Sequence, residues 1–337
     1  MKARMLREFI PVLLGVFICT VLILKKLIPV LKSHKIGQKI YDIGPRWHKG
    51  KEGTPIMGGA AFILSSLAAM IVLFCVYLYF GREKELLGAI LTMSMALLNG
   101  LIGFFDDYTK LIKKQNQGFL AWQKFLLQII VASLYVWAMA ACGFVDTALE
   151  IPYFNIELEL GVAYYLIAVL LVAGIVNAVN LTDGIDGLSS SVTAVVGCFF
   201  ALVAFAFCEV LPESSGLAVL SATVIGGTVG FLMYNFYPAR VFMGDTGSLY
   251  LGGMVVGMAF LMNEPLIILV AGIIYVIEVL SDILQVGYFK ISHGKRIFKM
   301  APIHHHFEKC GWSEIKIVCV FSAVTVVGCA LAWLGII

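Results

Sequence analysis

The sequence predicts an all-α polytopic membrane protein, because its residues are strongly apolar and fall into long apolar runs. Hydrophobic residues make up 61% of the 337 residues and charged residues only 13%, and the mean hydropathy is +0.95. Soluble domains are far more polar than this. A helix needs about 20 apolar residues to span the hydrocarbon core of a bilayer, and the chain holds about ten such runs. We therefore expect one integral-membrane domain over residues 1–337, with no separate water-soluble domain.

The predicted spans follow the apolar runs, and their boundaries are accurate to a few residues. They lie near residues 9–31, 54–80, 86–105, 122–142, 162–180, 187–208, 217–236, 247–263, 265–289 and 316–337. The first run is too long for a signal peptide and lacks a small-residue cleavage site, so we interpret it as a span. About ten spans place both termini on the same side of the membrane.

The basic residues of the connecting segments indicate the orientation. The odd-numbered connections carry seventeen Lys and Arg, including Lys124 and Lys316 at their edges, whereas the N-terminal tail and the even-numbered connections carry five. By the positive-inside rule the first set is cytoplasmic and both termini are extracytoplasmic. The tail holds three of the five and argues the other way, but the first connection outweighs it. On the outer face, near residues 145–160, alternating apolar and polar residues predict a small β-hairpin.

The most distinctive polar stretch is NAVNLTDGIDGLSSS, at residues 177–191. Asn177, Asn180, Asp183 and Asp186 recur every three residues, so a helix would align them on one flank. Two carboxylates so close repel each other unless a cation or hydrogen-bond donors lie nearby. A turn capped by Asn, Asp and Gly is the alternative interpretation. Further polar clusters on the same predicted side favour a functional site.

Other acidic residues lie at the cytoplasmic ends of other predicted spans. Asp106 and Asp107 end the third span, and Asp245 lies in a Gly-Asp-Thr-Gly run before the eighth. Adjacent aspartates at a bilayer boundary cost free energy unless water, metal or a base compensates them. Oxygen ligands favour Mg²⁺ over zinc, and Mg²⁺ uses one or two carboxylates while substrate phosphates fill its other positions. The sequence thus indicates a magnesium site at this face.

Basic residues and histidines accompany these acids. The segment HKGKEGTPIMGG offers lysines and backbone N–H groups to a phosphate, although a basic loop that attracts anionic lipid is the simpler interpretation. In PIHHHFE, three consecutive histidines cannot all point one way, so phosphate binding or proton transfer fits better than a zinc site. Cations beside a magnesium site imply a polyanionic substrate. The combination indicates phosphoryl transfer at a membrane surface.

Five motifs carry a family resemblance: HKGKEGTPIMGG, FFDDY, NAVNLTDGIDGLSS, FMGDTGSL and PIHHHFE, in this order over residues 48–308. Together they resemble the phospho-N-acetylmuramoyl-pentapeptide transferases, a branch of the polyprenyl-phosphate N-acetylhexosamine-1-phosphate transferase family. The branch is set apart by PIHHHFE, because relatives that transfer N-acetylglucosamine phosphate have a shorter histidine motif. The resemblance implies Mg²⁺-dependent transfer of phospho-MurNAc-pentapeptide from UDP-MurNAc-pentapeptide to undecaprenyl phosphate, giving lipid I and UMP in peptidoglycan synthesis.

The resemblance also implies a cellular setting. It implies a ten-span catalytic domain in the bacterial inner (plasma) membrane, with its active site on the cytoplasmic face. It further implies a homodimer that contacts membrane lipid, and a part in cell wall biogenesis, cell shape and cell division. No nucleic acid partner is expected.

Carried over position by position, the resemblance assigns roles to individual residues. It implies that Asp106, Asp107, Asp245 and His304 are catalytic and that Asp245 is the Mg²⁺ ligand. The implied substrate-binding residues are Lys51, Thr54, Lys124, Asn180, Asp183, Gly184, Ile185, Asp186, Asn235, Phe242, His305 and His306. Asp282 departs from the family pattern, which has an apolar residue there. With Glu278 it forms an acidic i,i+4 pair, which we interpret as a water-facing or lysine-paired helix end.

Several alternatives stay open at this point. A related N-acetylglucosamine-1-phosphate transferase would share most of the motifs. An ion-coupled membrane transporter would place acids at the membrane midplane on broken helices within inverted repeats, whereas these acids cluster at one face and no repeat is visible. A lipid-binding scaffold would leave Asp245 and the histidines unexplained. For the transferase, the sequence does not separate direct displacement from a two-step route through an aspartyl adduct.

Overall fold

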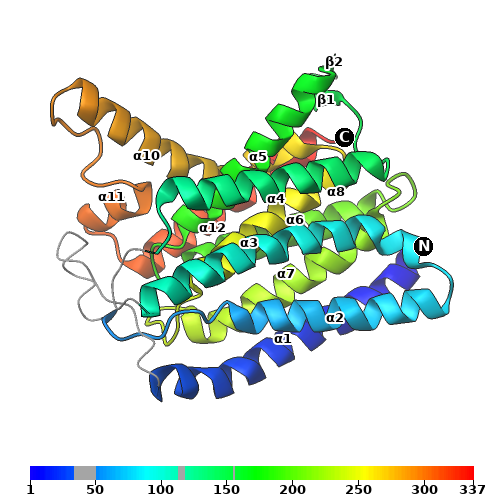
Figure 1. The fold of residues 1–337 in the computed structure, drawn as a ribbon, viewed down its shortest axis with the longest axis horizontal. Helices are drawn as coiled ribbons and strands as arrows, with labels where there is room; N and C mark the ends of the chain where they lie inside the picture. The colour runs from blue at the N-terminus through cyan, green and yellow to red at the C-terminus, as the bar shows by residue number, and fades with distance from the viewer. Residues whose placement is uncertain (34–50, 113–117, 155) are drawn as a thin grey trace.

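A computed structural model of the chain describes residues 1–33, 51–112, 118–154 and 156–337. These residues form a bundle of long helices with one short β-hairpin (Figure 1). His48 and most lysines and arginines of the first predicted connection, together with Lys113 and Lys114 of the second, lie outside the described residues. The structure therefore tests the predicted site through its acids, its histidines and the remaining lysines.

The long helices coincide with the predicted apolar runs. They are α1 (Lys2–Ser33), α2 (Ala60–Tyr79), α3 (Leu87–Ile112), α4 (Ala121–Ala141), α5 (Val162–Thr182), α6 (Leu188–Ala206), α7 (Ser214–Asn235), α8 (Gly244–Leu261), α10 (Ile273–Ile291) and α12 (Glu314–Leu334). The short elements are η2 (Glu83–Leu86), β1 (Ala148–Ile151), β2 (Ile156–Glu159), η3 (Pro265–Ile267), α9 (Ile268–Ala271) and α11 (Ile303–Lys309). The largely helical fold is thus confirmed.

The described residues contain fewer candidate spans than the ten predicted, and the predicted number stays a prediction. Within the described residues, 8 helices are long and apolar enough to cross a membrane, or 9 if the α9–α10 pair counts as one span. That pair bends by 82° between Pro265–Ala271 and Ile273–Ile291, so the run predicted as a ninth span is broken. The helix α8 is not among the eight, because Asp245 and its glycines lower its hydropathy. It lies inside the bundle instead, with every residue from Thr246 to Leu261 buried.

The β-hairpin and the two termini lie at the same end of the bundle (Figure 1). Strands β1 and β2 pair antiparallel, with Ala148 opposite Glu159 and Ile151 opposite Ile156. The hydroxyl of Tyr153, in the turn, donates a hydrogen bond of 3.0 Å to the carbonyl of Leu331 near the C-terminus. The predicted hairpin is therefore confirmed, and α11 lies at the opposite end of the bundle.

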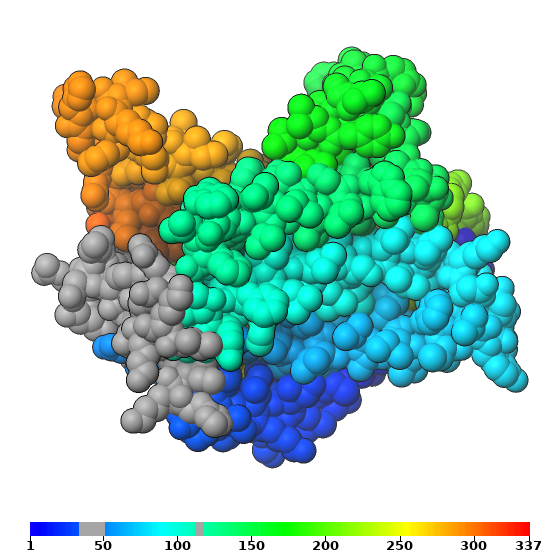
Figure 2. Space-filling view, in the orientation of Figure 1, coloured from blue at the N-terminus to red at the C-terminus, as the bar shows by residue number. Residues whose placement is uncertain are grey.

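The helix α10 leaves the bundle and then returns the chain to it. Figure 2 shows α10 standing apart from α5, with an open notch between them. The Gln285 carboxamide oxygen accepts hydrogen bonds from the backbone N–H groups of Ile297 (3.1 Å) and Phe298 (3.0 Å), and its amide donates to the Phe298 carbonyl (3.1 Å). These bonds fold the connection after α10 back along the helix, which brings α11 and its histidines toward the bundle.

The helices α3 and α8 touch backbone to backbone at Gly103. A Cβ added to Gly103 would lie 2.1 Å from the carbonyl oxygen of Asp245 and 2.6 Å from the backbone nitrogen of Thr246. Backbone atoms cannot swing aside as the end of a side chain can, so a residue larger than glycine would force the two helices apart. The start of α8 is therefore held against the end of α3.

We expect Gly103→Ala to lower the free energy of unfolding by about 1–3 kcal/mol, because overpacking a close helix crossing displaces backbone. The thermal midpoint of the purified protein in detergent measures the change. Gly174→Ala in α5 is the matched control, since nothing lies within 4 Å of a Cβ added there and alanine favours a helix by about 0.8–1 kcal/mol. Equal midpoints for the two variants would contradict the proposed close contact.

Candidate functional site

Three aspartates meet at the α3–α8 crossing. Asp106 and Asp107 lie near the end of α3, and Asp245 lies in the first turn of α8. Each offers a carboxylate oxygen, and these three atoms lie within 4.8 Å of one another. In the described part of the chain, this is the only group of His, Cys, Asp or Glu found that could hold a metal ion. The structure thus brings together the three acids predicted to be catalytic.

Two lysines compensate part of the negative charge of this cluster. The ammonium of Lys110 lies 2.7 Å from Asp106 Oδ2, 3.0 Å from Asp245 Oδ2 and 3.7 Å from Asp107 Oδ1. The ammonium of Lys124, from α4, lies 2.9 Å from Asp245 Oδ2. Lys124 was predicted as a site residue and Lys110 was not. Lys110 lies four residues after Asp106 and three after Asp107 on the same helix, and this spacing is the signal that would have identified it.

Asp107 caps the N-terminus of α8. Its Oδ2 accepts hydrogen bonds from the backbone N–H (3.0 Å) and the hydroxyl (2.8 Å) of Thr246, and its Oδ1 accepts from the Asp245 N–H (3.3 Å). The first N–H groups of a helix have no partner within it, and the helix dipole favours a negative charge there. Gly244 has φ +72°, and a Cβ there would lie 2.5 Å from Asp107 Oδ2. Only glycine fits this turn.

Asp245 and Asp106 are held by further hydrogen bonds. The Asn180 amide, at the end of α5, donates to Asp245 Oδ1 (2.9 Å) and to the Ser248 hydroxyl (2.7 Å). Lys124 Nζ lies 3.5 Å from the Asn180 carboxamide oxygen. Asp106 Oδ1 accepts from the backbone N–H of Phe119 (2.6 Å). The predicted residues Asn180, Lys124 and Asp245 therefore form one network that joins α4, α5 and α8.

The polar stretch at residues 177–191 is not one continuous helix. The helix α5 ends at Thr182 and α6 begins at Leu188, so the four residues at three-residue spacing do not share a flank. The Asn177 amide instead donates to the side-chain oxygen of Gln128 (2.6 Å) and to its own helix. Burial, followed by the charges of nearby carboxylates, raises the pKa of Asp183 to about 8. Burial and the neighbouring negative charges therefore both oppose ionisation of Asp183.

A second ionic cluster forms around Lys51. Its ammonium lies 2.7 Å from Asp186 Oδ1 and 2.6 Å from Glu314 Oε2. The same Glu314 oxygen accepts from the Asp186 N–H (2.9 Å), and Asp186 Oδ2 accepts from the Ala239 N–H (2.8 Å). Lys51 and Asp186 were both predicted to bind substrate. Glu314 was not, because nothing in the sequence near α12 indicates that it reaches these residues.

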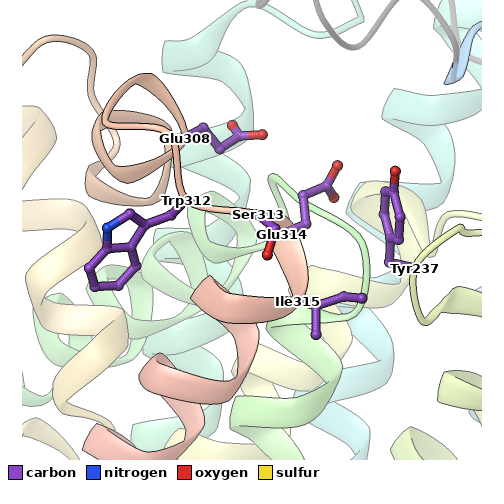
Figure 3. A pocket seen from close by; sticks show the side chains of 6 residues that line it. All are labelled: Tyr237, Glu308, Trp312, Ser313, Glu314 and Ile315. Atoms are coloured by element: carbon purple, nitrogen blue, oxygen red, sulfur yellow. The ribbon is translucent and has the colours of Figure 1, made fainter.

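A cavity of about 310 Å³ adjoins this second cluster. Figure 3 shows its lining side chains, which come from α11, the α11–α12 connection, the start of α12 and the α7–α8 connection: Tyr237, Glu308, Trp312, Ser313, Glu314 and Ile315. The Lys51 ammonium lies 6.0 Å from the centroid of the Tyr237 ring. Lys51 therefore stands near the part of the cavity that Tyr237 and Glu314 line.

The remaining predicted contacts connect three segments. The Asn235 carboxamide accepts from the Gly187 N–H (3.1 Å) and donates to the Val241 carbonyl (2.9 Å). The Phe242 N–H donates to the Pro55 carbonyl (2.8 Å). Thr54 is half-buried next to that bridge, and Ile185 is buried. The connections after α5 and α7 and the segment before α2 thus form one surface.

The three histidines take different partners. His304 Nδ1 lies 3.0 Å from Glu278 Oε2, and His305 Nδ1 lies 2.6 Å from Glu308 Oε2. His306 Nδ1 accepts from the backbone N–H of Lys299 (3.1 Å). Of the three, His304 is placed against the 183–187 connection, because a Cβ added to Gly184 would lie 2.1 Å from its Nε2.

The interpretation of Glu278 as a water-facing or lysine-paired residue is wrong. Glu278 is 0% exposed and pairs with His304, whose partner position the sequence does not reveal. Asp282, one turn further along α10, is half-buried. The acidic i,i+4 pair is therefore split between two environments.

The acid cluster has the chemistry of a divalent-cation site. Its ligand atoms are all carboxylate oxygens, which Mg²⁺ prefers. The ammonium of Lys110 already occupies a position close to oxygens of all three aspartates, so one cation can contact the whole cluster. The residues that could hold such an ion are Asp245, Asp106 and Asp107.

We expect Asp107→Asn to lower the free energy of unfolding by about 1–3 kcal/mol, because asparagine has one acceptor oxygen and leaves an N–H group of α8 without a partner. Thermal melting in detergent measures this effect. Asp146→Asn, an exposed aspartate beside β1, is the control and should melt as the wild type does. An unchanged midpoint for Asp107→Asn would show that α8 does not need this cap.

Comparisons with known proteins identify the family of the chain. Residues 89–263, which run from α3 through α8, match the model of Glycosyl transferase family 4. A phospho-N-acetylmuramoyl-pentapeptide-transferase of Clostridium acetobutylicum is 46% identical over 312 residues, 92% of this chain and 93% of that protein. Proteins of the same name from Clostridium perfringens and Listeria welshimeri are 44% identical (91% and 90% of the two chains) and 42% identical (94% of each).

The matched region contains Asp106, Asp107 and Asp245, and the similarity to the relatives extends over nearly the whole of both chains. The chain therefore belongs to Glycosyl transferase family 4, among the phospho-N-acetylmuramoyl-pentapeptide-transferases.

Proposed function

We propose that the protein transfers phospho-MurNAc-pentapeptide from UDP-MurNAc-pentapeptide to undecaprenyl phosphate, with Mg²⁺, and releases UMP and lipid I. An oxygen of the lipid phosphate attacks the β-phosphorus of the donor. The bond from that phosphorus to the bridging oxygen breaks, and UMP leaves with this oxygen. The observation that supports the proposal most is the convergence of Asp106, Asp107 and Asp245 beside two lysines. A polyanionic donor needs this mixture of cation-binding and cationic groups.

The acids and lysines have separate parts in this reaction. Asp245, supported by Asp106 and Asp107, would hold Mg²⁺, which supplies neutralisation of the developing phosphate charge when bound. Lys110 and Lys124 share Asp245 in the structure. If Asp245 bound Mg²⁺ in place of the two lysines, the ammoniums of Lys110 and Lys124 would be free to donate hydrogen bonds to phosphate oxygens. Catalysis is then mainly positioning and charge stabilisation.

The second cluster suits the uridine half of the donor. Lys51 and Asp186 lie on the surface formed by the 183–187 connection, with Asn235 behind it. Asp183 belongs to the same connection, and the resemblance implies that it lies near the metal and the diphosphate. The donor thus extends from Lys51 toward Asp245.

Direct displacement is the route that the contacts of Asp106 favour. A lipid phosphate has a second pKa of about 6, so it is mostly ionised at neutral pH and gains little from a base. Asp106 could act as a nucleophile in a two-step route, but its oxygens accept hydrogen bonds from Phe119 N–H and contact Lys110. Both oxygens of Asp106 therefore have partners in the free protein, and attack by either one on phosphorus would first require the loss of such a contact.

The membrane setting completes the proposal. We place the protein in the bacterial inner membrane with the acid cluster at the cytoplasmic face, the termini outside and two copies forming a homodimer, as the resemblance implies. The acids lie away from the end that carries the hairpin and both termini, which fits a surface site better than a midplane ion pathway of a transporter. The helix α10 exposes the apolar residues Ile277, Leu280 and Leu284, which suit the prenyl chain of a lipid acceptor.

We expect Asp245→Ala to abolish turnover, a loss of at least about 10²-fold, because the cluster then lacks its central carboxylate. The assay incubates the purified protein with UDP-MurNAc-pentapeptide, Mg²⁺ and undecaprenyl phosphate and measures UMP. Glu157→Gln on the exposed strand β2 is the control and should keep wild-type activity. Near-normal UMP release by Asp245→Ala would show that Asp245 is not the essential metal ligand.

A second measurement separates the two routes. Direct displacement predicts no exchange of labelled UMP into UDP-MurNAc-pentapeptide when the delipidated protein receives no polyprenyl phosphate. A two-step route predicts exchange, because an aspartyl adduct would form and release UMP without the acceptor. Exchange that is lost in Asp106→Asn would overturn direct displacement and identify Asp106 as the nucleophile.

A further inference from the structure

Glu278 is a buried carboxylate to which the proposed reaction gives no part. It lies on α10, is 0% exposed, and its Oε2 lies 3.0 Å from His304 Nδ1, whose residue is 1% exposed. Among the described residues, Glu278 Oε1 and His304 Nε2 have no hydrogen-bond partner. A buried carboxylate is costly unless it is paired and hydrogen-bonded. The two side chains therefore depend on each other.

This pairing determines which nitrogen of His304 faces a ligand. Because the carboxylate accepts the hydrogen bond, the proton lies on Nδ1, and Nε2 is the nitrogen left for another group. Nε2 faces the backbone of Gly184, in the connection between Asp183 and Asp186. Under the proposed function this connection binds the sugar-nucleotide donor.

The structure around α11 supports the same orientation. The helix α11 is only 7 residues long, and two residues of α10 tie it and its connection to that helix. Gln285 holds the backbone of Ile297 and Phe298, and Glu278, seven residues earlier on the same helix face, holds His304. The His305 ring packs against the His304 ring at 4.1 Å between centroids. Glu278 is thus the polar group that fixes the imidazole.

We propose that Glu278 is a positioning residue, which holds His304 with Nδ1 protonated and Nε2 directed at the 183–187 connection, where it contacts the phosphosugar donor. The inference rests on the proposed function, because it needs the donor to bind at that connection. A residue that only filled space would be replaced by an apolar side chain of similar size at little cost.

The test compares Glu278→Leu with Glu278→Gln. Leucine keeps the volume and removes the acceptor, so kcat/KM should fall by about 10- to 100-fold. The thermal midpoint should fall as well, because the buried Nδ1–H of His304 loses its partner. Glutamine can still accept from Nδ1–H and should keep more activity than leucine. Asp282→Asn, one turn away on α10, is the matched control and should behave as the wild type.

A double-mutant cycle and a spectrum complete the test. If Glu278 acts through His304, then Glu278→Leu combined with His304→Ala should lose no more activity than His304→Ala alone. The ¹⁵N shifts of the His304 ring should show a protonated Nδ1 in the wild type and the loss of this preference in Glu278→Leu. Wild-type kcat/KM in Glu278→Leu, additive losses in the double mutant, or an unchanged His304 spectrum would each overturn the proposal. Absence of UMP release by the wild type would instead overturn the proposed function, while the spectrum would still decide the pairing.

Discussion

The site depends on how the N-terminus of α8 is anchored. The helix begins at Gly244 and Asp245, which are half-buried, and Asp107 of α3 supplies acceptors for the N–H groups of Asp245 and Thr246. Gly103 and Gly244 let the two backbones approach closely enough for this capping. A buried carboxylate in this position is stabilised by the helix dipole and by several donors. The same contact places Asp245, one residue into α8, next to Asp106, so the capping interaction also assembles the acid cluster.

The charges of the cluster are largely compensated before any substrate arrives. Three carboxylates within a few ångströms repel one another, and the ammoniums of Lys110 and Lys124 compensate them. This arrangement connects stability with function, because groups that would otherwise be uncompensated charges satisfy one another in the free protein. A metal ion and a diphosphate together carry the same types of charge, so their binding exchanges partners without leaving a buried charge alone.

The sequence predicted the convergence of Asp106, Asp107 and Asp245, because residues at the same ends of neighbouring spans share one membrane face. It also predicted the hairpin and the positions of most helices from hydropathy alone. It missed Glu314 and the pairing of Glu278, since each meets a partner from a distant segment and no local spacing reports such a contact. The predicted flank of the 177–191 stretch failed because α5 ends at Thr182. Asn180, within the helix, bonds to Asp245, whereas Asp186, in the connection, pairs with Lys51.

The broken ninth run shows why hydropathy alone did not give the whole site. An unbroken span over residues 265–289 would place Glu278 and Gln285 within the membrane, where each unpaired polar group is costly. The bend of 82° between the two helices instead carries α10 out of the bundle, and the chain folds back so that its buried polar face meets α11. Glu278 and Gln285, which are unusual within an apolar run, are the residues that hold α11 and the connection before it. A polar side chain at a helical period inside an otherwise apolar run therefore indicates a partner segment elsewhere in the chain, here the one that brings His304 to Gly184.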